Sequence, residues 1–223
     1  MPLKRFFSND RSYAPYYLAH KALLAAPLPL TTPVEQLRFV VFDTETTGLN
    51  PRKDRLLSIG AVTVLGGDIP LDQTFDREVG QQQLRPSTGE AIAVHGILPH
   101  HATMAQPEEE VIRDFLGFLG DAVLVAHHVK FDVMMIEQAL KKYGGGPLLN
   151  RRIDTVQLAQ RAQRAGQGTT RAYKLDALAK QYDIPLHDRH TAAGDAYITA
   201  VLLLKLLHRL RHRGVHTLRD LLR

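Results

Sequence analysis

The run Phe39-Val40-Val41-Phe42 constrains the fold of this chain more than any other segment. Four consecutive apolar residues that favour β-structure predict a strand buried on both faces, which requires a sheet covered on both sides. Residues 56–65 and 71–79 predict two further strands joined by the turn Gly66-Gly67-Asp68. Short connections of this kind join antiparallel neighbours, so we expect the first three strands to form an antiparallel meander.

The pattern changes after residue 106. Three glutamates begin a predicted helix, and apolar residues then recur at helical spacing at Val111, Ile112, Phe115, Leu116 and Leu119. Short apolar strands at 122–126 and 152–154 alternate with helical segments that begin near residues 130, 156, 175 and 191. The pattern predicts an α/β fold with a mixed five-stranded sheet, an antiparallel meander plus parallel strands, flanked by helices. We divide the chain into a helical extension over 1–34, a main domain over 35–210 and a basic tail over 211–223.

Composition narrows the class of protein. The chain has 223 residues, a formal net charge of +5 and a pI near 9.5, which favours a polyanionic partner such as nucleic acid without establishing one. It contains no cysteine, which excludes disulfides and thiolate zinc sites. No apolar segment approaches the roughly 20 residues of a membrane-spanning helix, and the first residues do not form a secretory signal. We therefore expect a cytoplasmic protein without membrane contact.

Two carboxylates follow the buried strand directly. Strand side chains alternate between faces, so Asp43 and Glu45 point to the same side of the sheet. Two like charges beside an apolar core are unfavourable unless a cation neutralises them, and hard oxygen ligands suit Mg²⁺ or Mn²⁺. An isolated pair of this kind is also what a solvated strand end looks like, so the pair alone does not establish a metal site.

Two further acids stand in informative contexts. Asp132 lies near a predicted helix start that follows a strand, at the sheet edge where open α/β sheets bind ligands. A favourable contact between its carboxylate and the helix dipole explains an acid at this position equally well. Asp195 ends the segment His190-Thr191-Ala192-Ala193-Gly194-Asp195. On one helix His190 and Asp195 would diverge by about 140°, so we place His190 in the preceding loop. The small residues between them permit either close approach to a ligand or merely close packing of helix on sheet.

Taken together and in this order, three motifs resemble those of the DEDDh exonucleases of the DnaQ-like superfamily. Their residues are most similar to those of the proofreading epsilon branch. The motifs are Phe-Asp-Thr-Glu-Thr-Thr-Gly-Leu at 42–49, His-x-x-x-Phe-Asp ending at Asp132, and the segment from His190 to Asp195. The likeness extends to Val94-His95-Gly96-Ile97, Ile153-Asp154-Thr155 and Leu175-Asp176-Ala177-Leu178. It implies a ribonuclease H-like fold.

The resemblance also implies roles for individual residues. Asp43, Glu45, Asp132 and Asp195 would hold two divalent cations, Mg²⁺ or Mn²⁺, with His190 as the general base. The substrate side of the site would be formed by Thr44, Thr46, Thr47, Leu49, His95, His128 and Phe131. The implied reaction is 3′-to-5′ hydrolysis of DNA ends in proofreading or repair, releasing nucleoside 5′-monophosphates. The implied partners are single-stranded DNA 3′ ends and a DNA polymerase subunit, and the oligomeric state stays open.

The sequence departs from the family at two places. His128 stands where the second motif usually has asparagine, which affects contacts near the strand end rather than the metal site. The chain also ends in the basic stretch around residues 209–213 instead of a long carboxyl-terminal tail. Two alternatives remain at this stage: an exoribonuclease of the ribonuclease T or oligoribonuclease type, and a non-catalytic accessory subunit that binds strand ends. The histidine pairs at 100–101 and 127–128 lack a convincing set of zinc ligands.

Overall fold

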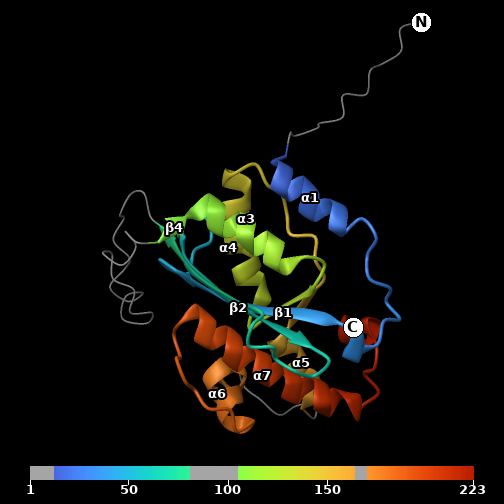
Figure 1. Ribbon diagram of the computed structural model, residues 1–223. Coiled ribbons are helices and arrows are strands. Elements are labelled where there is room, and N and C mark those ends of the chain that lie inside the picture. The colour runs from blue at the N-terminus through green and yellow to red at the C-terminus, as the bar shows by residue number, and fades with distance from the viewer. Residues whose placement is uncertain (1–12, 81–104, 164–169) are drawn as a thin grey trace, which may run out of the picture.

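The computed structural model describes residues 13–80, 105–163 and 170–223, and within them a six-stranded mixed sheet lies between two layers of helices (Figure 1). Its strand order is β4-β3-β2-β1-β5-β6. The strands are β1 (Arg38–Thr46), β2 (Leu56–Leu65), β3 (Thr74–Gly80), β4 (Gln106–Pro107), β5 (Val123–Ala126) and β6 (Arg152–Asp154). The meander β1-β2-β3 is antiparallel, whereas β5 pairs in parallel with β1 and β6.

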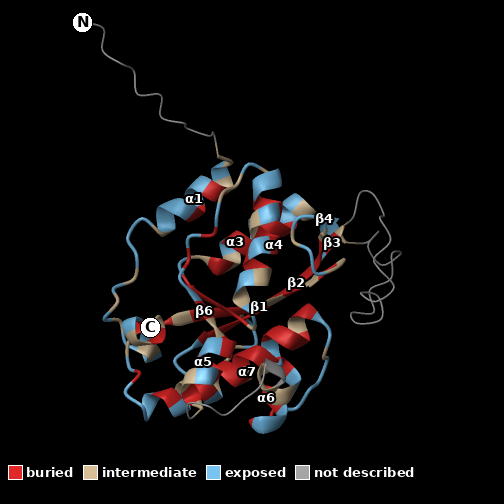
Figure 2. Cartoon of the chain, turned by 180° about the vertical axis from the view of Figure 1, so that it is seen from behind, coloured by how far each residue is buried: buried red, intermediate tan, exposed pale blue. Residues whose placement is uncertain are grey.

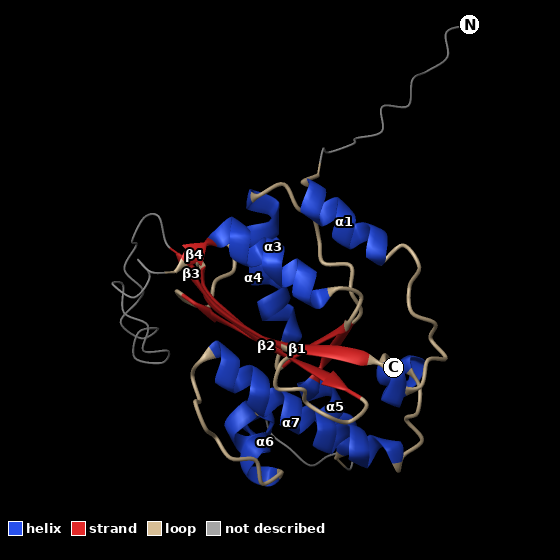
Figure 3. Cartoon of the chain, viewed as in Figure 1, coloured by secondary structure: helices blue, strands red, loops and turns tan. Residues whose placement is uncertain are grey.

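Helices cover both faces of the sheet (Figure 3). One face carries the N-terminal and middle helices α1 (Pro15–Leu23), α3 (Glu108–Leu119) and α4 (Val129–Lys142). The other carries α5 (Thr155–Ala162), α6 (Leu175–Gln181) and α7 (Ala192–Arg211). Short 3-10 turns, η1 (Val34–Gln36) and η3 (Thr170–Tyr173), and the last helix α8 (Leu218–Leu221) complete the described elements.

The alternation of β1 explains the two layers. Phe39 and Val41 enter the core beneath α5, α6 and α7, whereas Val40 and Phe42 enter the core beneath α3 and α4. All four are at most 2% exposed, so the strand is buried on both faces, as its sequence predicts (Figure 2). The sheet therefore separates two hydrophobic cores, and the C-terminal end of β1 lies between them.

Five strands are present as expected, and the sixth, β4, was not foreseen. This strand comprises only Gln106 and Pro107 and pairs in parallel with β3 at the sheet edge. Proline cannot donate a ladder hydrogen bond, so the edge is where such a segment is tolerated. The five apolar positions predicted for α3 are all buried, as a helix with one apolar stripe requires.

Both end segments pack on the rest of the protein. Helix α1 buries Tyr17 and His20, and the Tyr17 hydroxyl donates to the Pro147 carbonyl at 2.8 Å. Leu18 and Leu23 of this helix are exposed, because they lie around the helix from Tyr17 and His20. At the other end, backbone amides of Leu218 and Arg219 donate to the carbonyls at positions 32 and 30. The division into extension, main domain and tail stays a prediction, but residues 211–223 include a helix that joins the core.

No helix in the described part of the chain is both long enough and apolar enough to cross a membrane.

Candidate active site

The C-terminal half of β1 presents two kinds of side chain on its two faces. Asp43 and Glu45 follow Phe39 and Val41 and point toward α7, whereas Thr44 and Thr46 face the α4 side. Asp43 is the register partner of Gly60 in β2, and a Cβ at Gly60 would overlap the backbone where α7 begins. The absent side chain thus lets the start of α7 lie directly against the sheet beside Asp43.

Asp195 reaches the same place from the first turn of α7. Thr191 caps this helix by accepting a hydrogen bond from the Gly194 amide at 3.0 Å. Carboxylate oxygens of Asp43, Glu45 and Asp195 all lie within 4.8 Å of one another. Asp195 is 5% exposed, and its buried Oδ1 has no hydrogen-bond partner among the described residues. The structure therefore brings three of the four expected acids into one compact group.

Asp132, the fourth expected acid, lies just outside that group. It is buried in the first turn of α4, and its Oδ1 accepts hydrogen bonds from the Thr44 amide at 3.1 Å and the Thr44 hydroxyl at 2.7 Å. It is still close enough to Asp43 for its charge to raise the pKa of that carboxyl. Asp43 is thus close both to the other two acids of the group and to Asp132.

Burial and mutual repulsion make this group of acids difficult to ionise. Burial raises the pKa of Glu45 to about 7 and that of Asp132 to about 7. The pKa of Asp43 is well above its usual range, chiefly through burial and then through repulsion by Asp132 and Asp195. Burial also raises the pKa of Asp195, while Arg189 opposes the increase. A cation bound among these oxygens would relieve both the burial cost and the repulsion.

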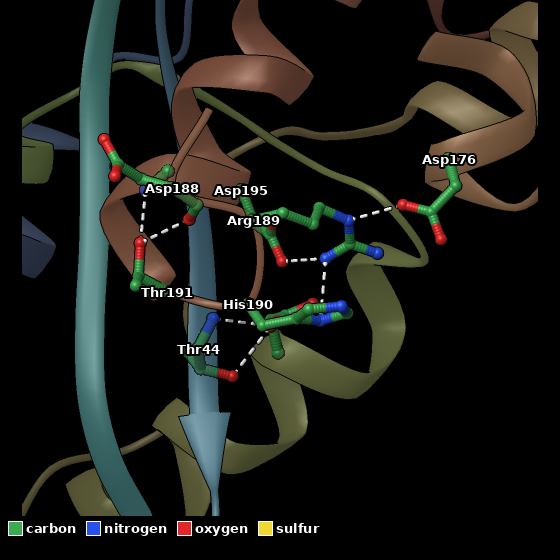
Figure 4. A network of polar contacts seen from close by, with 9 residues as sticks. Thr44, Asp176, Asp188, Arg189, His190, Thr191 and Asp195 are labelled. Atoms are coloured by element: carbon green, nitrogen blue, oxygen red, sulfur yellow. Dashed lines mark hydrogen bonds and ion pairs between the residues drawn. The ribbon is translucent and has the colours of Figure 1, made fainter. Parts of the chain in front are cut away.

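A short loop before α7 carries Arg189 and His190 close to Asp195 (Figure 4). His190 lies outside the helix, as predicted, and is exposed with a left-handed φ of 70°. Arg189 forms an ion pair with Asp195 through Nη1 and a second with Asp176 through Nε at 2.6 Å. The same Nη1 lies 3.4 Å from His190 Nδ1.

These residues fit divalent cations. Hard carboxylate oxygens converge, one of them is a buried oxygen without a partner among the described residues, and the sequence has no cysteine thiolate that would favour a softer metal. The three grouped acids and Asp132 are the residues that would hold such ions. The arrangement supports hydrolysis of a phosphoester, because positive charge held there would stabilise charge that develops on phosphate oxygens.

The residues expected to contact the substrate are distributed around this group. Thr44 is buried and bound to Asp132, and the Thr46 hydroxyl donates to the Gly48 carbonyl at 2.7 Å. The Thr47 hydroxyl donates to Asp54 at 3.1 Å and helps close the loop that leads to β2. Leu49 is 87% exposed at this loop, with its side chain free to meet a ligand.

His128 and Phe131 occupy the start of α4. His128 caps the helix with a left-handed φ of 66°, and its amide donates to Asp154 at 3.2 Å. Asparagine and histidine are both among the non-glycine residues that favour this conformation, which explains how histidine replaces the usual asparagine. Phe131 is partly buried against the core on the α4 side, and His95 lies outside the described residues.

Sequence reasoning missed three residues that shape the site. Gly60 has no motif of its own, and only the pairing of β2 with β1 reveals why it lacks a side chain. Arg189 stands next to His190, and that adjacency was the only available signal. Asp176 belongs to a segment that carries the family resemblance, but its ion pair with Arg189 depends on how α6 packs.

Comparison with known proteins places this geometry in a family. The family described as Exonuclease (RNase_T) matches residues 40–203. A DNA polymerase III subunit epsilon-like protein of Rhodobacter capsulatus is 39% identical over 192 residues, which cover 83% of this chain and 26% of that protein. A PolC-type DNA polymerase III of Halalkalibacterium halodurans is 35% identical over 184 residues, 82% of this chain and 12% of that protein.

A solved structure of Escherichia coli exonuclease I in complex with a dT13 oligonucleotide has the same fold. The two superpose with a TM-score of 0.70 at 18% identity, covering 80% of this chain and 43% of exonuclease I. The ribonuclease H-like fold is thereby confirmed. The chain spans about a quarter or less of the curated relatives described above. Because the family match covers most of the sequence and contains all four acids, this chain belongs to the exonuclease family.

Proposed function

We propose that this protein is a 3′-to-5′ exonuclease that hydrolyses the terminal phosphodiester bond of single-stranded DNA and releases nucleoside 5′-monophosphates. The observation that carries the proposal is the convergence of Asp43, Glu45 and Asp195 around a buried carboxylate oxygen without a partner. Such a group is costly for a protein to maintain unless it binds cations.

Two divalent ions, Mg²⁺ or Mn²⁺, are the proposed cofactors. The three grouped acids would hold one of them, and Asp43 with Asp132 the other, because Asp43 is close both to the group and to Asp132. When bound, such ions supply the positive charge that stabilises the attacking and leaving oxygens in phosphodiester hydrolysis.

His190 is the proposed general base. It is exposed on the loop that brings Arg189 to Asp195, where its imidazole could accept a proton from the attacking water. Its backbone is left-handed, and α7 begins two residues later. Histidine is suited to this task because imidazoles titrate near neutral pH.

The loop from Thr47 to Arg55 is the proposed contact with the substrate strand. It is closed by a hydrogen bond of 3.0 Å from the Thr47 amide to the Arg55 carbonyl, and it exposes Leu49. Its cations Arg52, Lys53 and Arg55 form no ion pair with any described residue, and with Lys142 they line a cavity of about 250 Å³. Unpaired cations beside an exposed apolar side chain suit a single strand, whose phosphates are charged and whose bases stack.

The biological setting follows from the relatives. Two of them are named as DNA polymerase III proteins, and the exonuclease I structure contains an oligonucleotide. We therefore propose proofreading or repair in the cytoplasm, with a DNA polymerase subunit as partner.

The decisive experiment compares digestion of 5′-labelled single-stranded DNA and RNA of the same sequence, with Mg²⁺ and with chelator. We expect stepwise shortening of DNA from the 3′ end, release of nucleoside 5′-monophosphates and no reaction in chelator. Asp43→Ala is expected to abolish the reaction and to retain the fold. Glu110→Gln, which alters an exposed acid in α3, is the matched control and should remain active.

Three outcomes would contradict the proposal. Full activity of Asp43→Ala would show that hydrolysis does not depend on the proposed metal site. Clearly faster digestion of RNA than of DNA would indicate that the enzyme is an exoribonuclease. Binding of DNA ends without hydrolysis would indicate an accessory subunit instead.

A further inference from the structure

The place of Arg189 in the acidic site is built by the surrounding chain. Two non-glycine residues with left-handed backbone flank it, Asp188 at φ 54° and His190 at φ 70°. This conformation is unfavourable for most side chains and persists where surrounding contacts enforce it. Here the Thr191 hydroxyl donates to the Asp188 carbonyl at 2.7 Å, and a Cβ at Gly194 would overlap that carbonyl. The loop therefore has one packed arrangement against α7, and it directs Arg189 toward Asp195.

Asp176 holds the other side of the guanidinium. It lies in the first turn of α6, and its Oδ1 accepts a hydrogen bond of 2.6 Å from Arg189 Nε. Figure 4 shows the guanidinium between Asp176 and Asp195, with His190 next to it. Asp176 does not belong to the acidic group, so metal binding by that group does not explain its position. Its hydrogen bond to Arg189 indicates that it positions the guanidinium.

Arg189 is also the cation that balances the acids. Its charge lowers the pKa values of Asp43, Glu45 and Asp195, opposing the burial that raises all three. It engages only Oδ2 of Asp195, while Oδ1 stays buried without a partner. A guanidinium and a divalent ion that neutralise the same carboxylates compete, because each reduces the electrostatic attraction available to the other.

We propose that Arg189, anchored by Asp176, is an internal counterion that competes with the divalent cation for Asp195 and so sets the metal affinity of the site. Without metal it stabilises the folded protein by neutralising the carboxylates. When a cation binds, Asp176 retains the arginine through Nε at the edge of the site. This inference rests on the proposed function, because it requires metal binding by these acids.

The test measures Mn²⁺ binding to the full chain by titration calorimetry, together with thermal unfolding in chelator and in saturating Mn²⁺. For Arg189→Gln we expect the Kd for Mn²⁺ to fall about tenfold, within the usual range of coupling between two ligands. We also expect a lower Tm in chelator and a larger increase in Tm on adding Mn²⁺. A merely structural arginine would give the opposite result for metal, because its loss would disorder the site and weaken binding.

Two further variants keep the test specific. Asp176→Asn removes one anchor of the guanidinium and should lower the Kd in the same direction by a smaller factor. Arg152→Gln removes a comparable ion pair with Glu137, which joins β6 to α4 away from Asp195, and should leave the Kd unchanged.

The outcomes separate this inference from the proposed function. Binding of Mn²⁺ by the unaltered protein, lost in Asp43→Asn but unchanged or weaker in Arg189→Gln, would overturn the role of Arg189 and leave the metal site standing. Absence of Mn²⁺ binding by the unaltered protein would overturn both.

Discussion

The two faces of β1 near its C-terminal end differ in how their polar groups are satisfied. On the α4 side the hydroxyls of Thr44 and Thr46 donate to Asp132 and to the Gly48 carbonyl, both at 2.7 Å. On the α7 side Asp43 and Glu45 face each other and Asp195, with Arg189 as the nearby cation. One face completes its hydrogen bonds within the protein, and the other gathers negative charge that a further cation would stabilise.

Within four consecutive residues, two hydroxyls are satisfied by hydrogen bonds and two carboxylates are held close to other negative charges. Removing a satisfied buried hydroxyl should destabilise the protein, whereas removing a repelled carboxylate should stabilise the metal-free protein and abolish its activity. The comparison can therefore be tested by the sign of the stability change as well as by activity.

The largest expected effect is that of Asp43→Asn on activity. Losing a ligand common to both proposed ions should reduce DNA hydrolysis by about a thousandfold or more, at about 1.4 kcal/mol of transition-state stabilisation per tenfold. In chelator at pH 8 the same variant should unfold at a higher temperature than the unaltered protein, because the amide relieves the repulsion. Thermal unfolding with parallel activity assays checks both, and a lower Tm in chelator would contradict our account of the carboxylate face.

His190→Ala should have the next largest effect, a loss of about a hundredfold or more, as is usual for removal of a general base. The increase of activity with pH near neutrality should disappear in this variant, and Mn²⁺ binding should persist. His187→Ala, an exposed histidine in the same connection, is the matched control and should keep the pH dependence. An unchanged pH profile in His190→Ala would exclude the proposed base.

Thr44→Val tests the opposite face. It removes the 2.7 Å hydrogen bond to Asp132 without much change in volume, so we expect a loss of about 1.5 to 3 kcal/mol of unfolding free energy, the usual range for bonds to charged groups. Activity should fall by about tenfold to a hundredfold, because Asp132 loses an orienting partner. Urea unfolding in chelator measures the stability change. A gain in stability would mean that removing a polar group has the same effect on both faces of β1, which would contradict the comparison.

The pH dependence of stability should distinguish metal-free from metal-bound protein. The pKa values of Glu45 and Asp132 are raised to about 7, so the folded state retains protons that the unfolded state loses near pH 4. In chelator the unfolding free energy should therefore fall as pH rises from about 4 to about 7. Saturating Mn²⁺ should reduce this fall, and Glu45→Gln should reduce it in chelator. Urea unfolding at several pH values across this range measures how the unfolding free energy depends on pH. An identical dependence with and without Mn²⁺ would argue against a metal site among these acids.

The smallest expected effect concerns the loop that follows β1. Replacing Arg52 and Lys53 by alanine in an Asp43→Asn background should reduce the salt dependence of single-strand binding by a slope of about 0.7 per lost phosphate contact. Lys205→Ala, which alters an exposed cation of α7, is the control. Fluorescence anisotropy at several salt concentrations measures the slope. Equal slopes for the loop and control variants would show that this loop does not contact the phosphates of the strand.

Most of the fold was predictable because it depends on local patterns. The antiparallel meander, the alternation after residue 106, and the position of His190 before α7 follow from apolar periodicity and helix geometry. The two-residue β4 was not predictable, because so short a strand has no period and exists only through its neighbour β3. The exposure of Leu18 and Leu23 was likewise not predictable, because apolar residues alone do not reveal which side of α1 meets α3.

The amino-acid sequence by itself determined the family and singled out four acids and a histidine as candidate site residues, since these are carried by residue types at fixed spacing. The tertiary structure decided which of the acids meet. It placed Asp43, Glu45 and Asp195 together, bound Asp132 to Thr44, and brought Asp176 and Arg189 to the same site. The physical reason is that mutual distance, burial and charge balance depend on how helices pack on a sheet, as at Gly60, and no linear motif records that packing.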